Sequence, residues 1–274
     1  MTSAVARPES ACRFSVSIVV YRPNMTMLER VLADLDAALA AVARARPSAT
    51  FDVCVVDNGG LPASFNAAAR GYRILSGHGN VGYGRGHNLA LGSASHYHLI
   101  LNPDIELETD ALVEALAFFD AHPEVGLIAP RIVDKEGRVQ YLCRRFPTVH
   151  DLFVRGFLPA CLHRPFATRL AYYEMRDLIN SRNVVFDPPI ISGCFMLFRT
   201  PILAALGGFD ARYFLYFEDY DLSLRAGRVT QIAYVPSVRV THFGGGAARK
   251  GGAHIRMFAA SAFKFFNRFG WRWL

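Results

Sequence analysis

A carboxylate placed directly after a buried strand is the clearest chemical signal in the sequence. Asn102, Pro103 and Asp104 follow the apolar run at residues 96–101. Pro103 cannot donate a backbone hydrogen bond, so strand pairing should stop there and leave Asp104 on a stiff turn. Open α/β sheets bind their ligands at the carboxyl ends of strands. Asn-Pro-Asp is also ordinary turn chemistry, so the motif needs support from the rest of the chain.

A second acid, Asp57, ends the apolar run at residues 51–56 and is followed by Asn58, Gly59 and Gly60. Two carboxylates at neighbouring strand ends would face the same crevice. One of them can accept a hydrogen bond from the base or ribose of a nucleotide, and the other can hold a cation on its phosphates. The alternative is a structural Asp-Asn-Gly turn.

Residues 77–86 contain five glycines, including a literal Gly-x-Gly-x-x-Gly at Gly77, Gly79 and Gly82. This pattern is also found in dinucleotide-binding dehydrogenases, which are therefore an alternative function for the chain. That fingerprint belongs to the turn after the first strand, however, and the first turn here has no glycine. The loop instead allows close backbone approach to an anion, with Arg85 and Asn88 among the donors.

Three acids lie within four positions at Glu218, Asp219 and Asp221. If a helix begins at Glu218, its dipole favours acids in the first turn, and Arg225 can pair with Asp221 four residues on. Alternatively, one acid faces the crevice as a general base, with its pKa raised by the crowded carboxylates and an apolar pocket. His242 ends a valine-rich strand before a glycine run, where a ligand role and a structural role are both open.

The elements that would position these residues alternate between strand and helix. Apolar runs predict strands at residues 14–21, 51–56, 72–75 and 96–101, and later at 126–133, 190–199, 232–235 and 238–243. Helices are predicted over residues 28–42, 109–122 and 218–226, with a short one near 88–94. The alternation predicts an α/β fold with a mostly parallel central sheet flanked by helices. We expect one domain over residues 1–254, with a nucleotide-binding half (14–108) and an acceptor half (109–254).

The composition narrows the class of protein. Lys and Arg exceed Asp and Glu by 30 − 23 = 7, which suits an anionic partner. Five scattered cysteines without a Cys-x-x-Cys pair argue against a zinc site or a disulfide scaffold and favour a reducing cytoplasm. We expect neither a signal peptide nor a membrane span, so the protein should be soluble or bound to a membrane from one side.

Taken together, the ordered motifs resemble the inverting family 2 glycosyltransferases of the GT-A (Rossmann-like) nucleotide-diphospho-sugar transferase fold, especially bacterial rhamnosyltransferase-like members. The motifs are Ser17-Ile-Val-Val-Tyr21, Val55-Val-Asp-Asn-Gly59, Gly79-Asn-Val-Gly-Tyr-Gly-Arg-Gly-His-Asn88, Leu101-Asn-Pro-Asp104, Ile191-Ser-Gly-Cys-Phe-Met-Leu-Phe-Arg199, Gly208-Phe-Asp210, Phe217-Glu-Asp219 and His242. Several motifs in order are far more specific than any one of them.

The resemblance implies a role for each matching residue. Asp219 would be the catalytic base within the Glu218–Asp219 pair. Asp104 and His242 would bind a divalent metal, Mg²⁺ or Mn²⁺. This sequence departs from the usual metal motif at its first acid, where it has Asn102. The nucleotide sugar would be bound by Tyr21, Asp57 (at the base), Asn58, Asn80, Gly82, Arg85, Asn88 and Asn102.

The expected activity is therefore transfer of a sugar, with rhamnose from dTDP-rhamnose as the best candidate, to a hydroxyl of a cell-surface polysaccharide or lipid-linked glycan. The non-enzyme alternative is a nucleotide-sugar-binding protein of the same fold without turnover, and the intact acid pair argues against it. A nucleic-acid partner is not expected, because the basic residues form no stripe interleaved with aromatic residues outside the tail.

The C-terminal segment, residues 255–274, is basic, aromatic and amphipathic. Its apolar residues follow helical spacing, and four basic residues gather on another face: Arg256, Lys264, Arg268 and Arg272. Two interpretations are open. The helix packs back on the domain, or it lies in the interface of an anionic membrane and holds the enzyme at the inner face of the cytoplasmic membrane.

Overall fold

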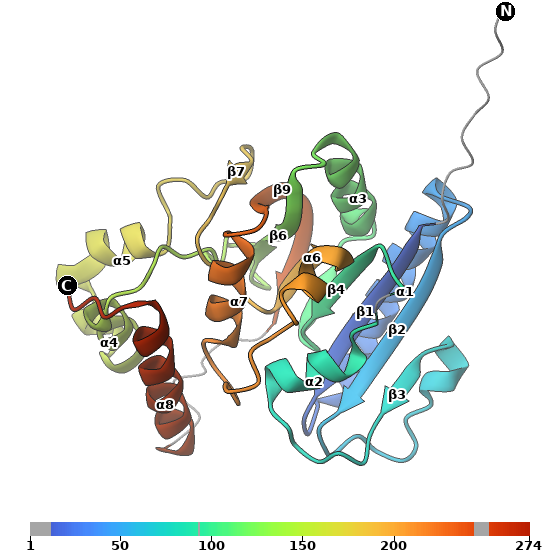
Figure 1. Cartoon of the computed structure of the whole chain (residues 1–274), viewed down its shortest axis with the longest axis horizontal. Coiled ribbons are helices and arrows are strands. Elements are labelled where there is room, and N and C mark those ends of the chain that lie inside the picture. The colour runs from blue at the N-terminus through green and yellow to red at the C-terminus, as the bar shows by residue number, and fades with distance from the viewer. Residues whose placement is uncertain (1–11, 93, 244–251) are drawn as a thin grey trace, which may run out of the picture.

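The computed structural model describes residues 12–92, 94–243 and 252–274. The glycine run that follows Phe243 in the sequence lies outside the described residues. One nine-stranded mixed sheet runs through the molecule in the order β3-β2-β1-β4-β8-β6-β9-β5, with β7 paired to β9 (Figure 1). The strands are β1 Arg13–Val20, β2 Thr50–Asp57, β3 Arg73–Leu75, β4 Tyr97–Leu101, β5 Ile105–Leu107, β6 Val125–Val133, β7 Val185–Phe186, β8 Phe195–Arg199 and β9 Gln231–His242.

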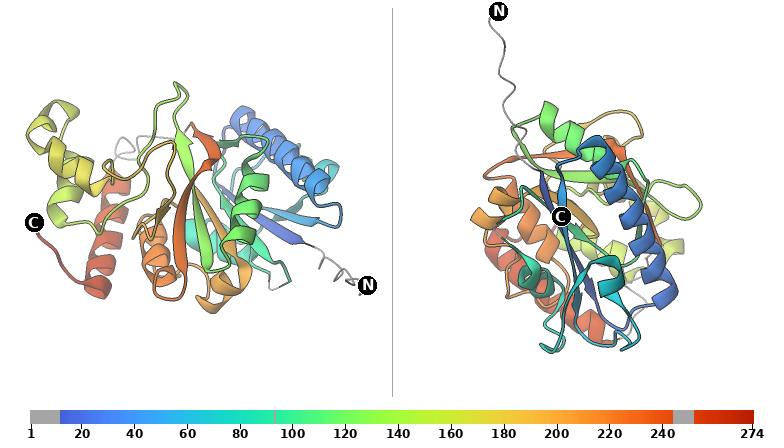
Figure 2. Two further views of the ribbon diagram at one scale, coloured as in Figure 1. Left: turned by 90° about the horizontal axis from the view of Figure 1, so that it is seen from above. Right: turned by 90° about the vertical axis from the view of Figure 1, so that its right-hand side faces the viewer.

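The helices cover both faces of this sheet. They are α1 Met25–Ala45, α2 Tyr83–Ala90, α3 Ala111–Ala121, α4 Val149–Phe157, α5 Ala167–Tyr173, α6 Thr200–Ala205, α7 Glu218–Ala226 and α8 Gly252–Phe269, with short 3₁₀ turns at Ala67–Arg70, Ala160–Leu162 and Arg164–Phe166. Leu32 of α1 and Leu116 of α3 belong to the apolar cluster on one face, whereas Leu203 of α6 and Leu222 of α7 belong to the cluster on the other. Figure 2 shows α1 and α3 together on one side of the strands.

The predicted nucleotide-binding half is a parallel arrangement. Strands β3, β2, β1 and β4 pair in parallel, with Val20 opposite Asp57 and Ile18 opposite Leu101. Their carboxyl ends therefore meet at one edge of the sheet. The strands that lead to Asp57 and Asp104 are not neighbours, in contrast to the prediction, because β1 lies between β2 and β4. The mostly parallel α/β fold is confirmed.

The antiparallel strands of this mostly parallel sheet lie in the second half. Strand β8 runs antiparallel to both β4 and β6, and β9 is parallel to β6 but antiparallel to β5. The two strands predicted at residues 232–235 and 238–243 are the single strand β9, whose pairing with β6 shifts register beside Pro236. A proline cannot donate to the ladder, which explains both the irregularity and the predicted break.

Two helical regions also differ from expectation. Helix α2 begins at Tyr83 inside the glycine-rich loop, five residues before the predicted helix near 88–94. Residues 144–183, where no helix was predicted, contain α4 and α5. None of the helices in the described residues is long and apolar enough to cross a membrane.

The aromatic face of α8 packs on the domain. Phe265 and Phe266 are buried in the same cluster as Tyr213 and Phe217. The basic residues of this helix are partly engaged as well, because Arg268 pairs with Asp210 and Asp221. Packing against the domain, one of the two interpretations of the C-terminal segment, is therefore what the structure shows for this face.

Candidate active site

The first predicted site residues lie where β1 and β2 end side by side. Oδ1 of Asp57 accepts hydrogen bonds from the backbone amides of Gly59 at 2.8 Å and Leu61 at 3.3 Å. Tyr21 follows β1, is about half exposed, and its ring lies against Gly59. Asp57 thus makes the structural turn that was the alternative interpretation, and the residue is partly exposed at the end of β2.

The side chains of Asn58 and Asn80 shape the glycine-rich loop from within. Buried Asn58 donates from Nδ2 to the carbonyl of Gly82 at 3.0 Å, and Oδ1 of Asn80 accepts from the Gly82 amide at 3.0 Å. Gly82 has φ +90°, and a Cβ there would lie 2.3 Å from the carbonyl oxygen of Phe214. Only glycine fits this close approach, so the loop has a fixed shape beside the strand ends.

The side chains of Arg85 and Asn88 bind other parts of the chain, whereas the resemblance implies that they contact the nucleotide sugar. Both polar atoms of the Asn88 amide bind the backbone of Phe209, at 2.7 and 2.9 Å, and the Arg85 guanidinium donates to the carbonyl of Ala211 at 2.6 Å. These bonds tie α2 to the segment that leads into α7. The two side chains therefore hold the site together in this structure.

The predicted metal ligands, Asp104 and His242, lie together. Strands β5 and β9 place Ile105 opposite His242, and Nε2 of His242 is 3.6 Å from Oδ2 of Asp104. Oδ1 of Asp104 and Oδ1 of Asn102 are buried and have no hydrogen-bond partner. Unsatisfied buried acceptors are costly, and oxygen atoms of this kind are what Mg²⁺ and Mn²⁺ prefer. The described residues contain no group of three or more acids, histidines or cysteines that would bind a metal alone.

Gln140 is a site residue that the sequence analysis missed. Its Oε1 lies 2.8 Å from Nδ1 of His242, and its Nε2 donates to the His242 carbonyl at 3.2 Å. Because the Gln140 oxygen can only accept a hydrogen bond, this contact places the proton on Nδ1 of His242. The other ring nitrogen, Nε2, lies on the side of Asp104 and then has a free lone pair that can bind a metal. Metal-binding histidines are oriented in this way by a second group.

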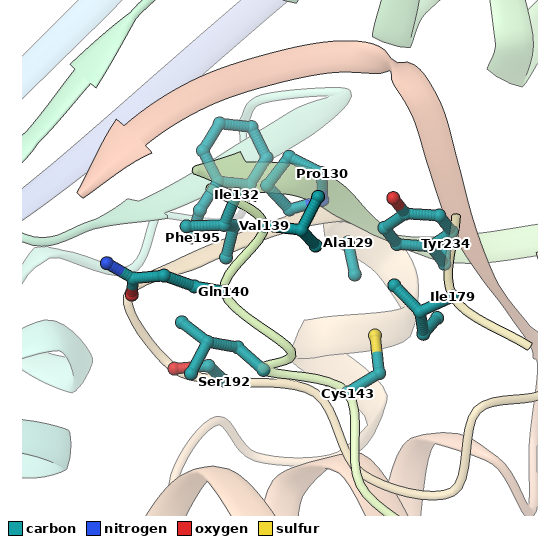
Figure 3. Close-up of a pocket in the computed structure, with 11 residues that line it drawn as sticks. Ala129, Pro130, Ile132, Val139, Gln140, Cys143, Ile179, Ser192, Phe195 and Tyr234 are labelled. Carbon is teal, nitrogen blue, oxygen red and sulfur yellow. The ribbon is translucent and has the colours of Figure 1, made fainter. Parts of the chain in front are cut away.

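A small cavity lies behind Gln140 and Ser192 (Figure 3). Its other walls include Ile132, Phe195 and Tyr234. With room for about 10 Å³, it can hold roughly one water molecule and no sugar. This cavity is therefore too small for either substrate.

Asp219 and Glu218 form the first turn of α7, as predicted. Oδ2 of Asp219 accepts from the backbone amide of Gly193 at 2.9 Å, and the hydroxyl of Tyr83 donates to the Gly193 carbonyl at 2.5 Å. The next carbonyl, that of Cys194, accepts from the amide of Asn102 at 2.9 Å. Residues 192–194 therefore join the acid pair on α7 to the Asn-Pro-Asp turn after β4.

The environment of the two acids favours their protonated forms. Burial raises the pKa of Glu218 to about 8, and the adjacent charge of Asp219 contributes to this shift. Burial also raises the pKa of Asp219, although the Gly193 and Tyr220 amides oppose the shift by stabilising the anion. Because Asp219 has these donors and Oε2 of Glu218 has no partner, the first proton to leave the pair should be that of Asp219.

The backbone that delivers these acids is strained. Tyr216 and Phe217 have φ values of +71° and +66°, in the left-handed region. For bulky residues this conformation costs about 1–3 kcal/mol each and persists only where the surroundings enforce it. Such strain is concentrated at functional sites.

No family model matches the chain, but curated proteins and solved structures do. An N-acetylglucosaminyl-diphospho-decaprenol L-rhamnosyltransferase from Mycobacterium tuberculosis is 32% identical over 251 residues, which are 83% of this chain and 75% of that protein. Rhamnosyltransferase WbbL from Escherichia coli is 27% identical over a region that covers 63% of this chain and 64% of that protein.

Solved structures show the same fold. TarS from S. aureus (residues 1–349, in complex with UDP-GlcNAc) matches with a TM-score of 0.58 at 16% identity, covering 93% of this chain and 67% of that one. The mannosyltransferase PcManGT from Pyrobaculum calidifontis, in complex with GDP-Man and Mn²⁺, matches with a TM-score of 0.55 at 17% identity, covering 86% of this chain and 58% of that one.

The fold and the relatives agree with one another. The chain belongs to the rhamnosyltransferase-like glycosyltransferases with the GT-A fold.

Proposed function

We propose that this glycosyltransferase moves rhamnose from dTDP-rhamnose to a hydroxyl of a lipid-linked N-acetylglucosamine, with inversion at the anomeric carbon. The lipid-linked acceptor follows the name of the relative from Mycobacterium tuberculosis. One observation supports catalysis most strongly. Residues 192–194 bind Asp219 on one side and Asn102 on the other. The proposed base for the acceptor hydroxyl, Asp219, therefore lies beside the turn that would hold the diphosphate.

The chemistry follows from the placement of these groups. Asp219 takes the proton from the acceptor hydroxyl, and the oxygen forms a new bond to the anomeric carbon. The bond from that carbon to the phosphate oxygen breaks on the opposite face, and the nucleoside diphosphate leaves with the electron pair. A positioned base contributes about 10²–10⁴-fold in rate. Asp57 and Tyr21, at the far end of the strand edge, are the proposed contacts of the nucleotide base.

A divalent metal fits the residues present. Asp104 supplies a carboxylate with a free oxygen, and His242 supplies Nε2 with its ring oriented by Gln140. Two protein ligands suffice for Mg²⁺ or Mn²⁺ when the diphosphate supplies the others. The bound ion would neutralise the charge that develops on the leaving diphosphate. Asn102 contributes at most a neutral oxygen, so we expect weaker metal affinity than a pair of acids would give.

We also propose a peripheral membrane location, because the acceptor is a lipid. The tail lies beside the start of α4, where the amides of Val149 and His150 donate to the carbonyls of Arg272 and Trp273. Four exposed aromatic side chains project from these two elements: Phe153, Phe157, Trp271 and Trp273. We call these four residues the aromatic surface.

The charge around the aromatic surface suits an anionic bilayer. Residues 252–274 contain no acid, and the one acid within residues 149–173, Asp151, is buried and paired with Arg169. Aromatic side chains with nearby Lys and Arg are typical of interfacial binding, and each basic residue adds roughly 1 kcal/mol near an acidic surface.

The function is tested by incubating the full chain with dTDP-rhamnose, Mg²⁺ and a prenyl-diphospho-N-acetylglucosamine. Formation of a rhamnosyl product with inverted anomeric configuration is expected, and release of dTDP without product would reject the acceptor. For the membrane contact, vesicles with anionic lipid should bind the protein at low salt and lose it at high salt. A double variant, Phe153→Ser with Phe157→Ser, should no longer float with these vesicles while keeping its turnover of a short-chain acceptor.

A further inference from the structure

The segment that leads into the catalytic acids is held between two other elements. On one side, the carbonyl of Phe214 accepts from the amide of Tyr83, at the start of α2 and next to the glycine-rich loop, at 3.0 Å. On the other side, the carbonyl of Leu215 accepts from the buried hydroxyl of Ser261, in the middle of α8, at 2.8 Å. The two residues that follow are the left-handed pair, Tyr216 and Phe217.

Helix α8 contacts this segment along most of its length. Near the start of the helix, Nδ1 of His254 lies 2.8 Å from the hydroxyl of Tyr216. Further along, Nζ of Lys264 donates to the carbonyl of Arg212 at 2.7 Å. Figure 1 shows α8 lying beside α7 and the chain that enters it.

Aromatic packing and an ion pair complete this contact. The ring of Phe217 lies 5.1 Å from that of Phe258 and 5.2 Å from that of Phe265. Near the end of the helix, one nitrogen of Arg268 donates to both Asp210 and Asp221 at 2.6 Å. Asp210 and Asp221 lie on either side of the catalytic acids in the sequence, so α8 spans the whole approach to them.

The left-handed turn needs such support. Helix α7 has Phe217 at its N-cap, and no side-chain hydrogen bond caps it there. Bulky residues leave the left-handed region when nothing holds them. A relaxed turn would rotate the first residues of α7, which are Glu218 and Asp219. None of the α8 contacts named above, all within the described residues, reaches the strand ends where the donor nucleotide is proposed to bind.

We propose that α8 is a positioning element for sugar transfer: it holds residues 215–217 in their left-handed turn, and in this way it fixes where the carboxylate of Asp219 lies in the crevice. Ser261 and His254 are positioning residues, because they act through Leu215 and Tyr216 rather than on a substrate. The inference rests on the proposed role of Asp219 as the base.

The main test is Ser261→Ala in the full chain. Alanine removes the bond to Leu215 and favours the helix at least as well as serine, so the fold should be kept. We expect kcat to fall about tenfold, while KM for dTDP-rhamnose and the melting temperature stay close to wild type. Ala260→Ser, on the exposed side of the same helix, is the control and should match wild type in all three quantities. An unchanged kcat in Ser261→Ala would overturn the proposal.

A second pair of variants covers the case in which Ser261→Ala is unstable. His254→Ala removes the contact with the hydroxyl of Tyr216 near the helix start, and His254→Asn keeps a polar atom close to the place of Nδ1. Lower kcat in the alanine variant with recovery in the asparagine variant supports positioning. Equal rates in both would contradict it.

A measurement without substrate separates this inference from the proposed function. Amide hydrogen exchange of the peptide spanning residues 213–221 should be faster in Ser261→Ala than in wild type or Ala260→Ser. If dTDP-rhamnose is no substrate of the wild type but exchange rises as expected, the donor is wrong and the support of the turn by α8 stands. Unchanged exchange overturns the support whatever the donor is.

Discussion

The backbone amide of Gly193 donates to the carboxylate of Asp219 at 2.9 Å, which links two parts of the chain 26 residues apart. This bond fixes one oxygen of Asp219, while the amide of Tyr220 binds the other at 3.0 Å. The carboxylate is therefore oriented before any substrate arrives. A preoriented base loses little freedom in the reaction, which is a large part of what an enzyme site supplies.

Asp219→Asn should abolish transfer and leave donor binding nearly intact. The change is close to isosteric; it removes the capacity to accept a proton and one of the two oxygens that accept from backbone amides. We expect turnover to fall by at least 10²-fold, in line with the contribution of a positioned base. Steady-state rates and calorimetric titration with dTDP would measure the two properties separately. More than about a tenth of wild-type turnover would mean that another group is the base.

Glu218→Gln should retain most of the turnover at neutral pH. With a pKa of about 8, Glu218 is largely protonated there, and glutamine resembles that neutral form in shape and charge. The rate should therefore stay within about tenfold of wild type at pH 7. A loss as large as that of Asp219→Asn would show instead that the charge of Glu218 takes part in the reaction.

The same substitution should change how stability depends on pH. Glu218 has an ordinary pKa of 4.5 and keeps its proton up to about pH 8 in the folded protein. Between pH 4.5 and pH 8, the Glu218 carboxyl is protonated in the folded state and ionised in the unfolded state. The contribution of Glu218 to stability is therefore full below pH 4.5 and is lost as the pH rises towards 8. Glutamine cannot ionise. Melting temperatures should therefore favour Glu218→Gln over wild type increasingly from pH 5 to pH 8, and a constant difference would contradict the raised pKa.

Asp104→Ala should weaken donor binding chiefly when metal is present. Titrations of dTDP-rhamnose with Mn²⁺ and with chelator separate the metal-dependent part of the affinity. Gln140→Ala should also weaken metal-dependent binding, but less strongly, because it removes only the contact that orients the ring of His242. Loss of a residue that orients a metal ligand typically lowers metal affinity by about 10–100-fold. Equal wild-type affinities with Mn²⁺ and chelator would indicate a metal-independent enzyme.

The parts of this site that follow from local sequence were predictable. Helix α7 spans Glu218–Ala226 as expected, since first-turn acids and Arg225 mark both of its ends. Asp57 follows from its apolar strand in the same way, because the end of β2 is visible in the pattern of residues.

The contacts between distant residues were not predictable. Gln140 and His242 are 102 residues apart, and nothing local distinguishes Gln140 from any other surface glutamine. Tyr83 and Gly193 lay inside recognised motifs, but their mutual bond depends on how α2 meets the start of β8. The early start of α2 was missed because Gly84 and Gly86 are poor helix formers. They are needed there because a Cβ would lie within 3 Å of Phe209 or Val19.

The C-terminal helix offers a test by two phenylalanines two residues apart. Phe265 is fully buried among the rings of Phe146, Phe217 and Tyr220, whereas Phe263 is 57% exposed. Phe265→Ala should destabilise the protein by about 3–5 kcal/mol through lost burial and a cavity, and Phe263→Ala should change stability by much less. Urea unfolding of both variants measures the difference.

A chain cut after His254 extends the same prediction. It loses the buried phenylalanines and leaves Asp221, which is fully buried, without one of its two arginine partners. Removing one partner of a buried ion pair costs several kcal/mol, so the cut chain should unfold or aggregate at temperatures where the full chain is folded. If the cut chain and Phe265→Ala both melt at the wild-type temperature, α8 does not belong to the core. Its contacts with residues 210–221 could then not support the catalytic acids.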